Sequence, residues 1–345
     1  NAEGYIYSRI ANPTVAILEQ RLAELEGGIG GLAVASGHAA QFLAINNLIQ
    51  PGKNLVSSPY LYGGTVSQFK LTFKNLGIEV RIAESLDPAA FEALIDENTR
   101  GLYMETIGNP GFTVPDFDAF KAISDKFGIP IVVDNTFAGG GYLCQPLLQG
   151  AHIVVESATK WISGNGTSIA GVIIDGGNFN WANGNFPQFT DPAPEYHGIN
   201  FFETFKEAAF IVRARVIGLR DFGPSLSPFN AFMVIHGVET LSLRMDRHCS
   251  NAQLLAEYLD QHPQVEKVSY PGLSTDSNHE TAKKYLRNGF GGALSFSVKG
   301  GKENGLKLVD NLKLVSHLAN VGDAKTLIIQ PSATTHQQLT EEEQI

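Results

Sequence analysis

The stretch VVESATKWISGNG, residues 154–166, decides how the rest of the chain is interpreted. A strand-like apolar run ends at Glu156, and Lys160 follows it, preceded by the hydroxyl residues Ser157 and Thr159. A lone lysine after a buried strand is most often a surface residue whose stem packs against apolar neighbours. A functional interpretation of Lys160 therefore depends on which reactive side chains lie at the ends of the neighbouring strands.

Short apolar segments alternate with helical ones throughout the first half of the chain. The strand-like segments read GLAVAS, KNLVSS, GIEVRIA, RGLYMET, IPIVVDN, AHIVVES and SIAGVIID. Strand–helix alternation with two-sided apolar strands predicts an α/β fold with a large, mostly parallel sheet covered on both faces. A first helix is predicted after Asn12-Pro13, and Gly27-Gly28 close it.

The pattern predicts three parts along the chain. Residues 1–12 form an N-terminal segment, 13–243 the large sheet domain, and 244–345 a smaller α+β domain with strands such as GALSFSVKG and KTLIIQP. A polar excursion rich in Pro and aromatic residues spans 176–202. Residue 1 is not Met, and Thr340 with Glu343 has capping-box spacing close to the last residue, so we expect both ends to be truncated.

Composition disfavours several classes of protein. The 25 Lys and Arg against 35 Asp and Glu give a net charge of −10, which disfavours a nucleic-acid or anionic-membrane partner. Two cysteines give no disulfide framework, and the nine histidines lack metal-site spacing. The sequence shows no apolar run of membrane-spanning length and no leader, so we expect a cytoplasmic protein.

A glycine motif raises the alternative of a dinucleotide-binding oxidoreductase. The segment GIGGLA, residues 28–33, fits the spacing G-x-G-x-x-A. It follows a predicted helix and precedes a predicted strand, which reverses the context that the phosphate contact requires. We interpret the segment as a helix end and a turn.

Lys160 acquires a chemical partner from the preceding strand. The segment IPIVVDN delivers Asp134 at its carboxyl end, and ligands of parallel sheets bind outside these ends. A lysine and an aspartate at adjacent strand ends suit pyridoxal phosphate, which needs an amine for its Schiff base and a carboxylate to keep its ring nitrogen protonated. An aspartate in this place is more often a helix cap or a turn residue, so it carries the interpretation only together with Lys160.

The remaining parts of a phosphate-bearing cofactor also have candidates. The turn ASGHAA, residues 35–40, places Gly37 and His38 at a helix start, where free backbone N–H groups favour an anion. Ser157 and Thr159 supply hydroxyls to the same phosphate. Tyr62, before a glycine pair, offers an aromatic plate over the ring. A simple capped turn and a packed tyrosine are the alternatives for these two loops.

These residues lie in motifs that resemble the pyridoxal-phosphate enzymes of cysteine and methionine metabolism. The motifs are YSRIANPT (7–14), SGHAA (36–40), LYGGT (61–65), ETIGNP (105–110), VVDNTFA (132–138) and SATKWISGNG (157–166). The later motifs LSPFNAF, ETLSLRMDRHC, NVGDAKTLIIQP and TTHQQLTEEEQ, together with the 176–202 excursion, resemble the O-acetylhomoserine sulfhydrylase branch of that family. The resemblance covers nearly the whole chain.

The resemblance implies an aspartate-aminotransferase-like fold, fold type I, and a role for each matching residue. Lys160 would carry the cofactor as a Schiff base, Asp134 would pair with the ring nitrogen, and Tyr62 would stack on the ring and act in proton transfer. The phosphate would be held by the residues Gly37, His38, Ser157 and Thr159, with Asn109 at the phenolic oxygen and with Tyr7 and Arg9 contributed from a neighbouring subunit. A surface ion pair is the alternative for Arg9.

The implied reaction is a γ-replacement that converts O-acetyl-L-homoserine and sulfide to L-homocysteine and acetate, in a homo-oligomer that is a dimer of dimers. The alternatives are a cystathionine γ-synthase, a cystathionine or methionine γ-lyase, and a non-catalytic scaffold. His38 replaces the Met or Gln common in relatives, and Ser332 and Ala333 are exchanged relative to their PAST loop. We expect the arginine that binds the substrate carboxylate to lie beyond Ile345.

Overall fold

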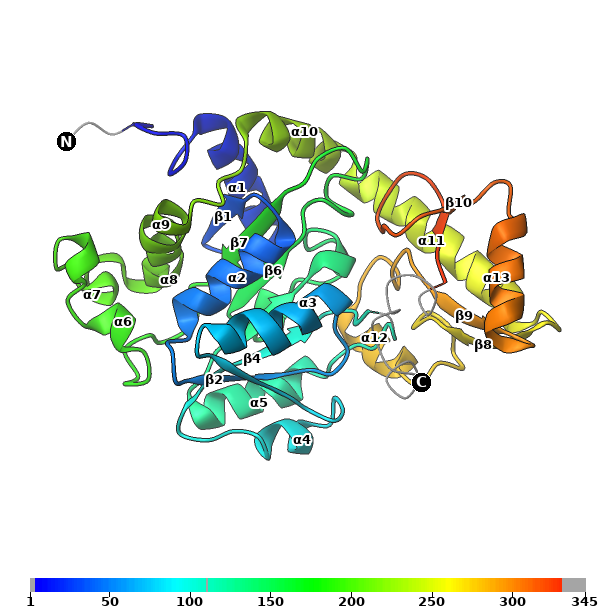
Figure 1. The fold of residues 1–345 in the computed structure, drawn as a ribbon, viewed down its shortest axis with the longest axis horizontal. Coiled ribbons are helices and arrows are strands. Elements are labelled where there is room, and N and C mark those ends of the chain that lie inside the picture. Colours follow the sequence, from blue (N-terminus) through cyan, green and yellow to red (C-terminus); the bar gives the residue numbers. More distant parts are fainter. Residues whose placement is uncertain (1–3, 110, 331–345) are drawn as a thin grey trace.

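The computed structural model describes residues 4–109 and 111–330. It contains a seven-stranded sheet, with helices on both faces, and a smaller region beyond it (Figure 1). In spatial order the strands are β1 (Gly30–Val34), β7 (Gly171–Asp175), β6 (Ile153–Glu156), β5 (Ile131–Asp134), β4 (Thr99–Glu105), β2 (Asn54–Ser57) and β3 (Glu79–Ile82). The α/β fold predicted from the strand–helix alternation is confirmed.

Four of the six strand pairings in this sheet are parallel, as predicted, but β7 runs antiparallel to both of its neighbours, β1 and β6. A parallel pairing requires a crossover that returns the chain to the starting edge of the sheet. The link from β6 to β7, residues 157–170, consists of turns and holds no crossover helix. The stretch that carries Lys160 is therefore a connection within an antiparallel pair.

The main helices are α1 (Pro13–Glu26), α2 (Gly37–Leu48), α3 (Gly63–Ser67), α4 (Pro88–Glu92), α5 (Phe117–Phe127), α6 (Pro187–Thr190), α7 (Phe201–Phe205), α8 (Ala209–Arg213), α9 (Arg220–Phe222), α10 (Pro228–Glu239), α11 (Leu241–Asp260), α12 (His279–Tyr285) and α13 (Gly301–Asn311). The predicted first helix is confirmed: the Asn12 side chain accepts the amides of Thr14 and Val15, and Gly27 ends it at φ 75°. A positive φ is accessible to glycine without a Cβ clash.

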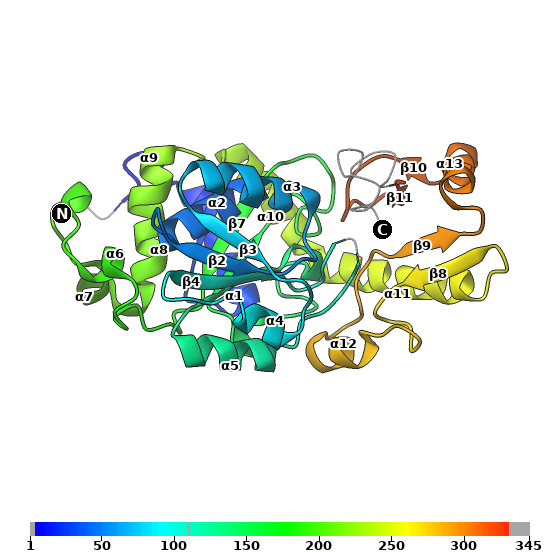
Figure 2. The same cartoon turned by 60° about the horizontal axis from the view of Figure 1, so that its bottom comes forward.

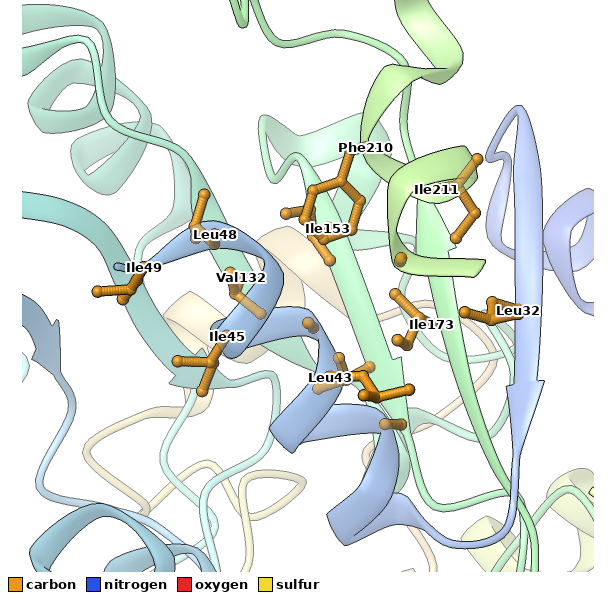
Figure 3. Close-up of a cluster of buried hydrophobic side chains, with 14 of the residues drawn as sticks. Leu32, Leu43, Ile45, Leu48, Ile49, Val132, Ile153, Ile173, Phe210 and Ile211 are labelled. Atoms are coloured by element: carbon orange, nitrogen blue, oxygen red, sulfur yellow. The ribbon is translucent and has the colours of Figure 1, made fainter. Parts of the chain in front are cut away.

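Alternate strand residues point to opposite faces and enter different cores. Val132, Ile153 and Ile173 of the sheet pack against α2 and α8. Figure 3 shows these three side chains facing Leu43 and Leu48 of α2 and Phe210 of α8. Their neighbours in sequence pack on the other side of the sheet, where α1, α5 and α10 lie. The chain therefore has the two-sided covering that the apolar strands predict.

The excursion at 176–202 is less polar than its composition indicates. Trp181, Phe186, Phe189 and Phe201 are fully buried and join Phe210 of α8 in one aromatic cluster. The rings join the hydrophobic core that covers the α2 face of the sheet. This cluster extends the large sheet region at the end occupied by α6 and α7 (Figures 1 and 2).

The long helix α11 leads from the large sheet to the smaller region (Figure 2). The strands there form the antiparallel pair β8 (Val265–Ser269) with β9 (Ser295–Val298) and the parallel pair β10 (Ser316–His317) with β11 (Leu327–Ile328). The predicted boundary at 243/244 falls inside α11, and the domain division stays a prediction. Thr340, Glu343, Ser332 and Ala333 lie outside the described residues. Within these, no helix is long and apolar enough to cross a membrane.

Candidate active site

Lys160 lies in the turn that follows β6. Its backbone N–H donates to the Ser157 carbonyl at 3.1 Å, and its carbonyl accepts the Gly164 N–H at 2.8 Å. The side chain is partly buried, and this burial lowers the pKa of the amine. Its Nζ donates to Oδ1 of Asn320 at 2.7 Å. The lysine is therefore held inside the structure and is not a free surface residue.

Asp134 ends the neighbouring strand, β5, and pairs in parallel register with Val155 of β6. Its Oδ1 accepts the Thr136 N–H at 2.9 Å. Burial raises the pKa of the Asp134 carboxyl, while hydrogen bonds from Thr136 and the charge of His38 lower it. The structure thus brings the aspartate and the lysine to neighbouring strand ends on one edge of the sheet, as predicted.

The N-terminus of α2 lies against the turn that carries the lysine. A Cβ added to Gly37 would lie 2.6 Å from the Cβ of Ser157, so only glycine fits this approach. The Ser36 hydroxyl accepts the N–H of Ala39. In the part of the chain that the structure describes, the amides of Gly37 and His38 are left for an external acceptor, because the first turn of a helix has no internal one.

The two hydroxyl residues before Lys160 have different surroundings. The Ser157 N–H donates to Oγ1 of Thr136 at 2.8 Å, and its side chain faces Gly37. The Thr159 hydroxyl donates to the Ala170 carbonyl at 3.1 Å and accepts the Ala170 N–H at 3.0 Å. Ser157 therefore lies at the helix N-terminus, whereas the Thr159 hydroxyl already bridges the two ends of its own turn.

Tyr62 and Asn109 lie on two loops that one buried glutamate joins. Oε1 of Glu105 accepts the Tyr62 N–H at 2.7 Å, and Oε2 accepts the Asn109 N–H at 3.1 Å. The Tyr62 side chain is 49% exposed, and its ring meets that of His38 edge-on at 5.8 Å between centroids. The predicted aromatic plate is thus next to the predicted phosphate-binding turn.

Tyr7 and Arg9 are not brought to Lys160 of the same chain. The Arg9 guanidinium lies 5.2 Å from the centre of the Tyr7 ring, and it donates to the carbonyl of Arg220 in α9. Tyr7 is 59% exposed. Their predicted place at the site of a neighbouring subunit stays a prediction.

Two further residues that bind the lysine and its turn are not evident from sequence reasoning. Asn320 binds the lysine amine, and the guanidinium of Arg244 donates to the carbonyls of Trp161 (2.6 Å), Ile162 (3.0 Å) and Gly237 (2.8 Å). Both lie in the conspicuous motifs 239–249 and 320–331, but no local pattern links either of them to Lys160. Glu105 has a signal of its own, since it ends a buried strand as Asp134 does.

A family model for the Cys/Met metabolism PLP-dependent enzymes matches residues 1–345. The chain belongs to this family. The homocysteine/cysteine synthase of Kluyveromyces lactis is 56% identical, over 99% of this chain and 80% of that protein. The O-acetyl-L-homoserine sulfhydrylase 1 of Thermus thermophilus is 54% identical, over 99% of this chain and 81% of its own.

A solved structure supports the same assignment. The metY protein of Campylobacter jejuni, described as an O-acetylhomoserine (thiol)-lyase with N'-pyridoxyl-lysine-5'-monophosphate, superposes with a TM-score of 0.95. It is 39% identical, and the match covers 99% of this chain and 82% of that one. The fold is therefore that of the PLP-dependent enzymes of this family.

The side chains of this chain fit the cofactor of the Cys/Met metabolism family. A partly buried amine and a carboxylate lie at neighbouring strand ends, which matches the aldehyde and the ring nitrogen of pyridoxal phosphate. The absence of a side chain at Gly37 lets the N-terminus of α2 lie against Ser157, so that free helix amides and a hydroxyl are side by side, a set that suits a phosphate. The chain is accordingly a PLP-dependent enzyme.

Proposed function

We propose that the chain catalyses the γ-replacement of O-acetyl-L-homoserine by sulfide, which yields L-homocysteine and acetate. The observation that carries the proposal is the placement of Lys160 and Asp134 at neighbouring strand ends, in a chain that matches O-acetylhomoserine sulfhydrylases along almost its entire length. In this reaction the Cγ–O bond to acetate breaks, and a Cγ–S bond to sulfide forms.

Pyridoxal phosphate supplies an aldehyde that takes up the substrate amine and a ring that withdraws electrons from the carbons next to it. Lys160 would hold the aldehyde through its amine, and the same amine, when free, would accept the Cα proton of the substrate. Burial favours the neutral form of this amine, which is the form that accepts a proton. Asp134 holds the proton on the ring nitrogen.

The remaining site residues bind and orient. The amides of Gly37 and His38 and the Ser157 hydroxyl bind the phosphate, and the Thr159 hydroxyl joins them when it gives up its bond to the Ala170 carbonyl. Tyr62 covers the ring and excludes water from one side, and Asn109 contacts the phenolic oxygen. The Tyr62 and Asn109 assignments can be tested by substitution, because the bonds that hold these residues to Glu105 are made by their backbones and not by their side chains.

The first experiment is a visible absorption spectrum of the purified protein, before and after O-acetylhomoserine is added. A yellow protein whose band shifts on addition supports reaction with the substrate amine. Homocysteine formation is then measured with sulfide and with cysteine as alternative acceptors. Product only with sulfide supports the sulfhydrylase, and cystathionine from cysteine would instead support a cystathionine γ-synthase, the runner-up. Turnover of O-acetylhomoserine without an acceptor would indicate a γ-lyase.

The assembly and location are also proposals. We propose a homo-oligomer, a dimer of dimers. Tyr7 and Arg9 support a site shared between subunits, because both are assigned to a phosphate site while Arg9 contacts α9 of its own chain and Tyr7 packs against Arg9. We further propose a large domain of residues 13–243 and a small one from 244, a cytoplasmic location, and no nucleic-acid or membrane partner. The net charge of −10 supports the last point. Light scattering of the purified protein measures the oligomeric state.

A further inference from the structure

Glu105 is a buried carboxylate at the edge of the sheet where Asp134 lies. It is the last residue of β4 and pairs directly with Asp134 of β5 in the parallel register. Only 6% of the residue is exposed. A buried carboxyl group is retained at a cost unless its oxygens are hydrogen-bonded, so its partners indicate what it does.

Both oxygens of Glu105 accept a backbone N–H, and the two donors come from different loops. The first is Tyr62, which precedes α3 on the loop that follows β2. The second is Asn109, on the loop that follows β4. The sequence separation is 43 residues in one direction and 4 in the other. One side chain thus binds the backbones of two residues that are assigned to the ring of the cofactor and to its phenolic oxygen.

The two loops also touch each other beside this carboxylate. A Cβ added to Gly108 would lie 2.9 Å from the Cβ of Tyr60 and 2.8 Å from the hydroxyl of Thr113. The backbone at Gly108 therefore packs closely against Tyr60, with no room for a side chain between the two loops. Because Tyr62 is half exposed and its ring touches only the edge of His38 among the ring contacts described, its position depends on its backbone.

We propose that Glu105 is a positioning residue for this site: its two oxygens hold the backbones of Tyr62 and Asn109 in one mutual arrangement. The inference deepens the proposed function and rests on it, since both residues are assigned to the cofactor there. Burial, and next the charge of the neighbouring Asp134, hold the pKa of Glu105 well above its ordinary value, and the two amide donors only partly oppose this shift. The geometry of the two bonds carries the inference, because each oxygen accepts one backbone N–H.

The test is the substitution Glu105→Gln, studied first without cofactor. A glutamine has one oxygen and one NH2 group, so it can accept only one of the two backbone N–H groups. Its NH2 group then lies opposite the other N–H, and two donors repel each other. We expect hydrogen exchange to become about tenfold faster in peptides that contain Tyr62 or Asn109, because one hydrogen bond of ordinary strength is lost. Peptides from the Lys160 turn should exchange as in the unchanged protein.

The second readout is taken on the cofactor-loaded protein. We expect a changed circular dichroism signal in the visible band of the bound cofactor, and kcat lowered by about tenfold or more, since misplacement of a positioning loop is costly. Glu19→Gln is the matched control: Glu19 is a buried glutamate whose Oε1 accepts the Ala33 N–H at 2.9 Å. It should alter protection near Ala33 and leave the cofactor signal unchanged.

The outcomes separate this proposal from the proposed function. Unchanged exchange at both loops, or faster exchange with an unchanged cofactor signal and kcat, overturns the role of Glu105. If the unaltered protein makes no homocysteine, yet Glu105→Gln changes both exchange and the cofactor signal, the function fails and the positioning role stands. If Glu105→Gln does not fold, Glu105→Asp is tested with the same readouts, and we expect a smaller change in the same direction.

Discussion

The Nζ of Lys160 donates to the side-chain oxygen of Asn320 at 2.7 Å, across 160 residues of sequence. The two residues come from different parts of the structure, since Asn320 lies between β10 and β11 in the smaller region. Backbone contacts reinforce this one: the Ala324 N–H donates to the Gly164 carbonyl at 3.0 Å. A Cβ on Gly322 would lie 2.5 Å from the backbone nitrogen of Trp161. The segment 320–324 therefore packs closely against the turn that carries Lys160.

Asn320→Asp should change the protonation of the lysine amine. A carboxylate next to the amine stabilises its charged form, so we expect the pH limb of kcat that reports this base to move up by about 1 unit. Asn320→Ala removes the acceptor without adding charge and should lower kcat with no upward movement. Identical pH profiles for all three proteins would show that this contact does not act on the amine.

Arg244→Lys should loosen the turn that carries Lys160. The guanidinium reaches three carbonyls at once, and a lysine cannot reproduce this planar geometry. We expect kcat to fall by about tenfold, with a lower midpoint of thermal unfolding. Arg247→Lys, at an exposed position on the same helix, is the control. Equal kcat values for the two variants would contradict the role of Arg244.

Asp134→Asn should separate cofactor binding from catalysis. The amide still fills the site but no longer favours a protonated ring nitrogen, so we expect near-normal cofactor content and kcat lowered by about 100-fold. Asp175→Asn is the matched control, because Asp175 is a buried aspartate at the end of β7, on the opposite edge of the sheet. Asp175→Asn should change the free energy of unfolding and leave kcat per bound cofactor unchanged.

Mixing two inactive variants tests whether the site is shared between subunits. Lys160→Ala lacks the amine, and Arg9→Ala lacks the proposed phosphate contact from the neighbouring chain. After unfolding and refolding together, random pairing should restore about a quarter of the normal activity, because mixed dimers then contain one intact site. No recovery in the mixture, with both variants assembled, would contradict a shared site.

His152 should make the fold sensitive to acid. Its Nδ1 accepts the Ile131 N–H at 3.0 Å, and burial lowers the pKa of the imidazole to about 4. Since the unfolded chain binds this proton at its ordinary pKa near 6.5, the neutral ring stabilises the fold above that pH, and its contribution falls as the pH drops towards 4. The loss should reach about 2 kcal/mol at pH 5.

The measurement is urea unfolding of the cofactor-free protein at pH 7.5 and pH 5, compared with His152→Gln. The variant keeps an acceptor but cannot titrate, so its free energy of unfolding should fall less between the two pH values. Buried Asp175 has its pKa raised to about 7 and acts in the opposite direction, but it is present in both proteins. His317→Gln, at an exposed position, is the control and should lose as much free energy of unfolding between the two pH values as the unchanged protein does. If the unchanged protein loses no more than His152→Gln, the assignment to His152 is refuted.

The order of strands and helices along the chain, and the placement of Lys160 and Asp134 at neighbouring strand ends, could be predicted from the sequence. Apolar runs of strand length and local caps such as Asn12 are local signals, and they place the elements. Because parallel strands end at one edge of a sheet, the sequence also predicts that Lys160 and Asp134 share that edge. The motifs around them were sufficient to indicate the family.

Only the tertiary structure decided which residues surround these two. The antiparallel course of β7, the hold of Asn320 and Arg244 on the lysine turn, and the two loops joined by Glu105 depend on contacts between distant segments. Such contacts leave no periodicity in the sequence, because they follow from how whole elements pack against one another. The sequence by itself determined the reactive groups, and the packing of the elements decided what holds them in place.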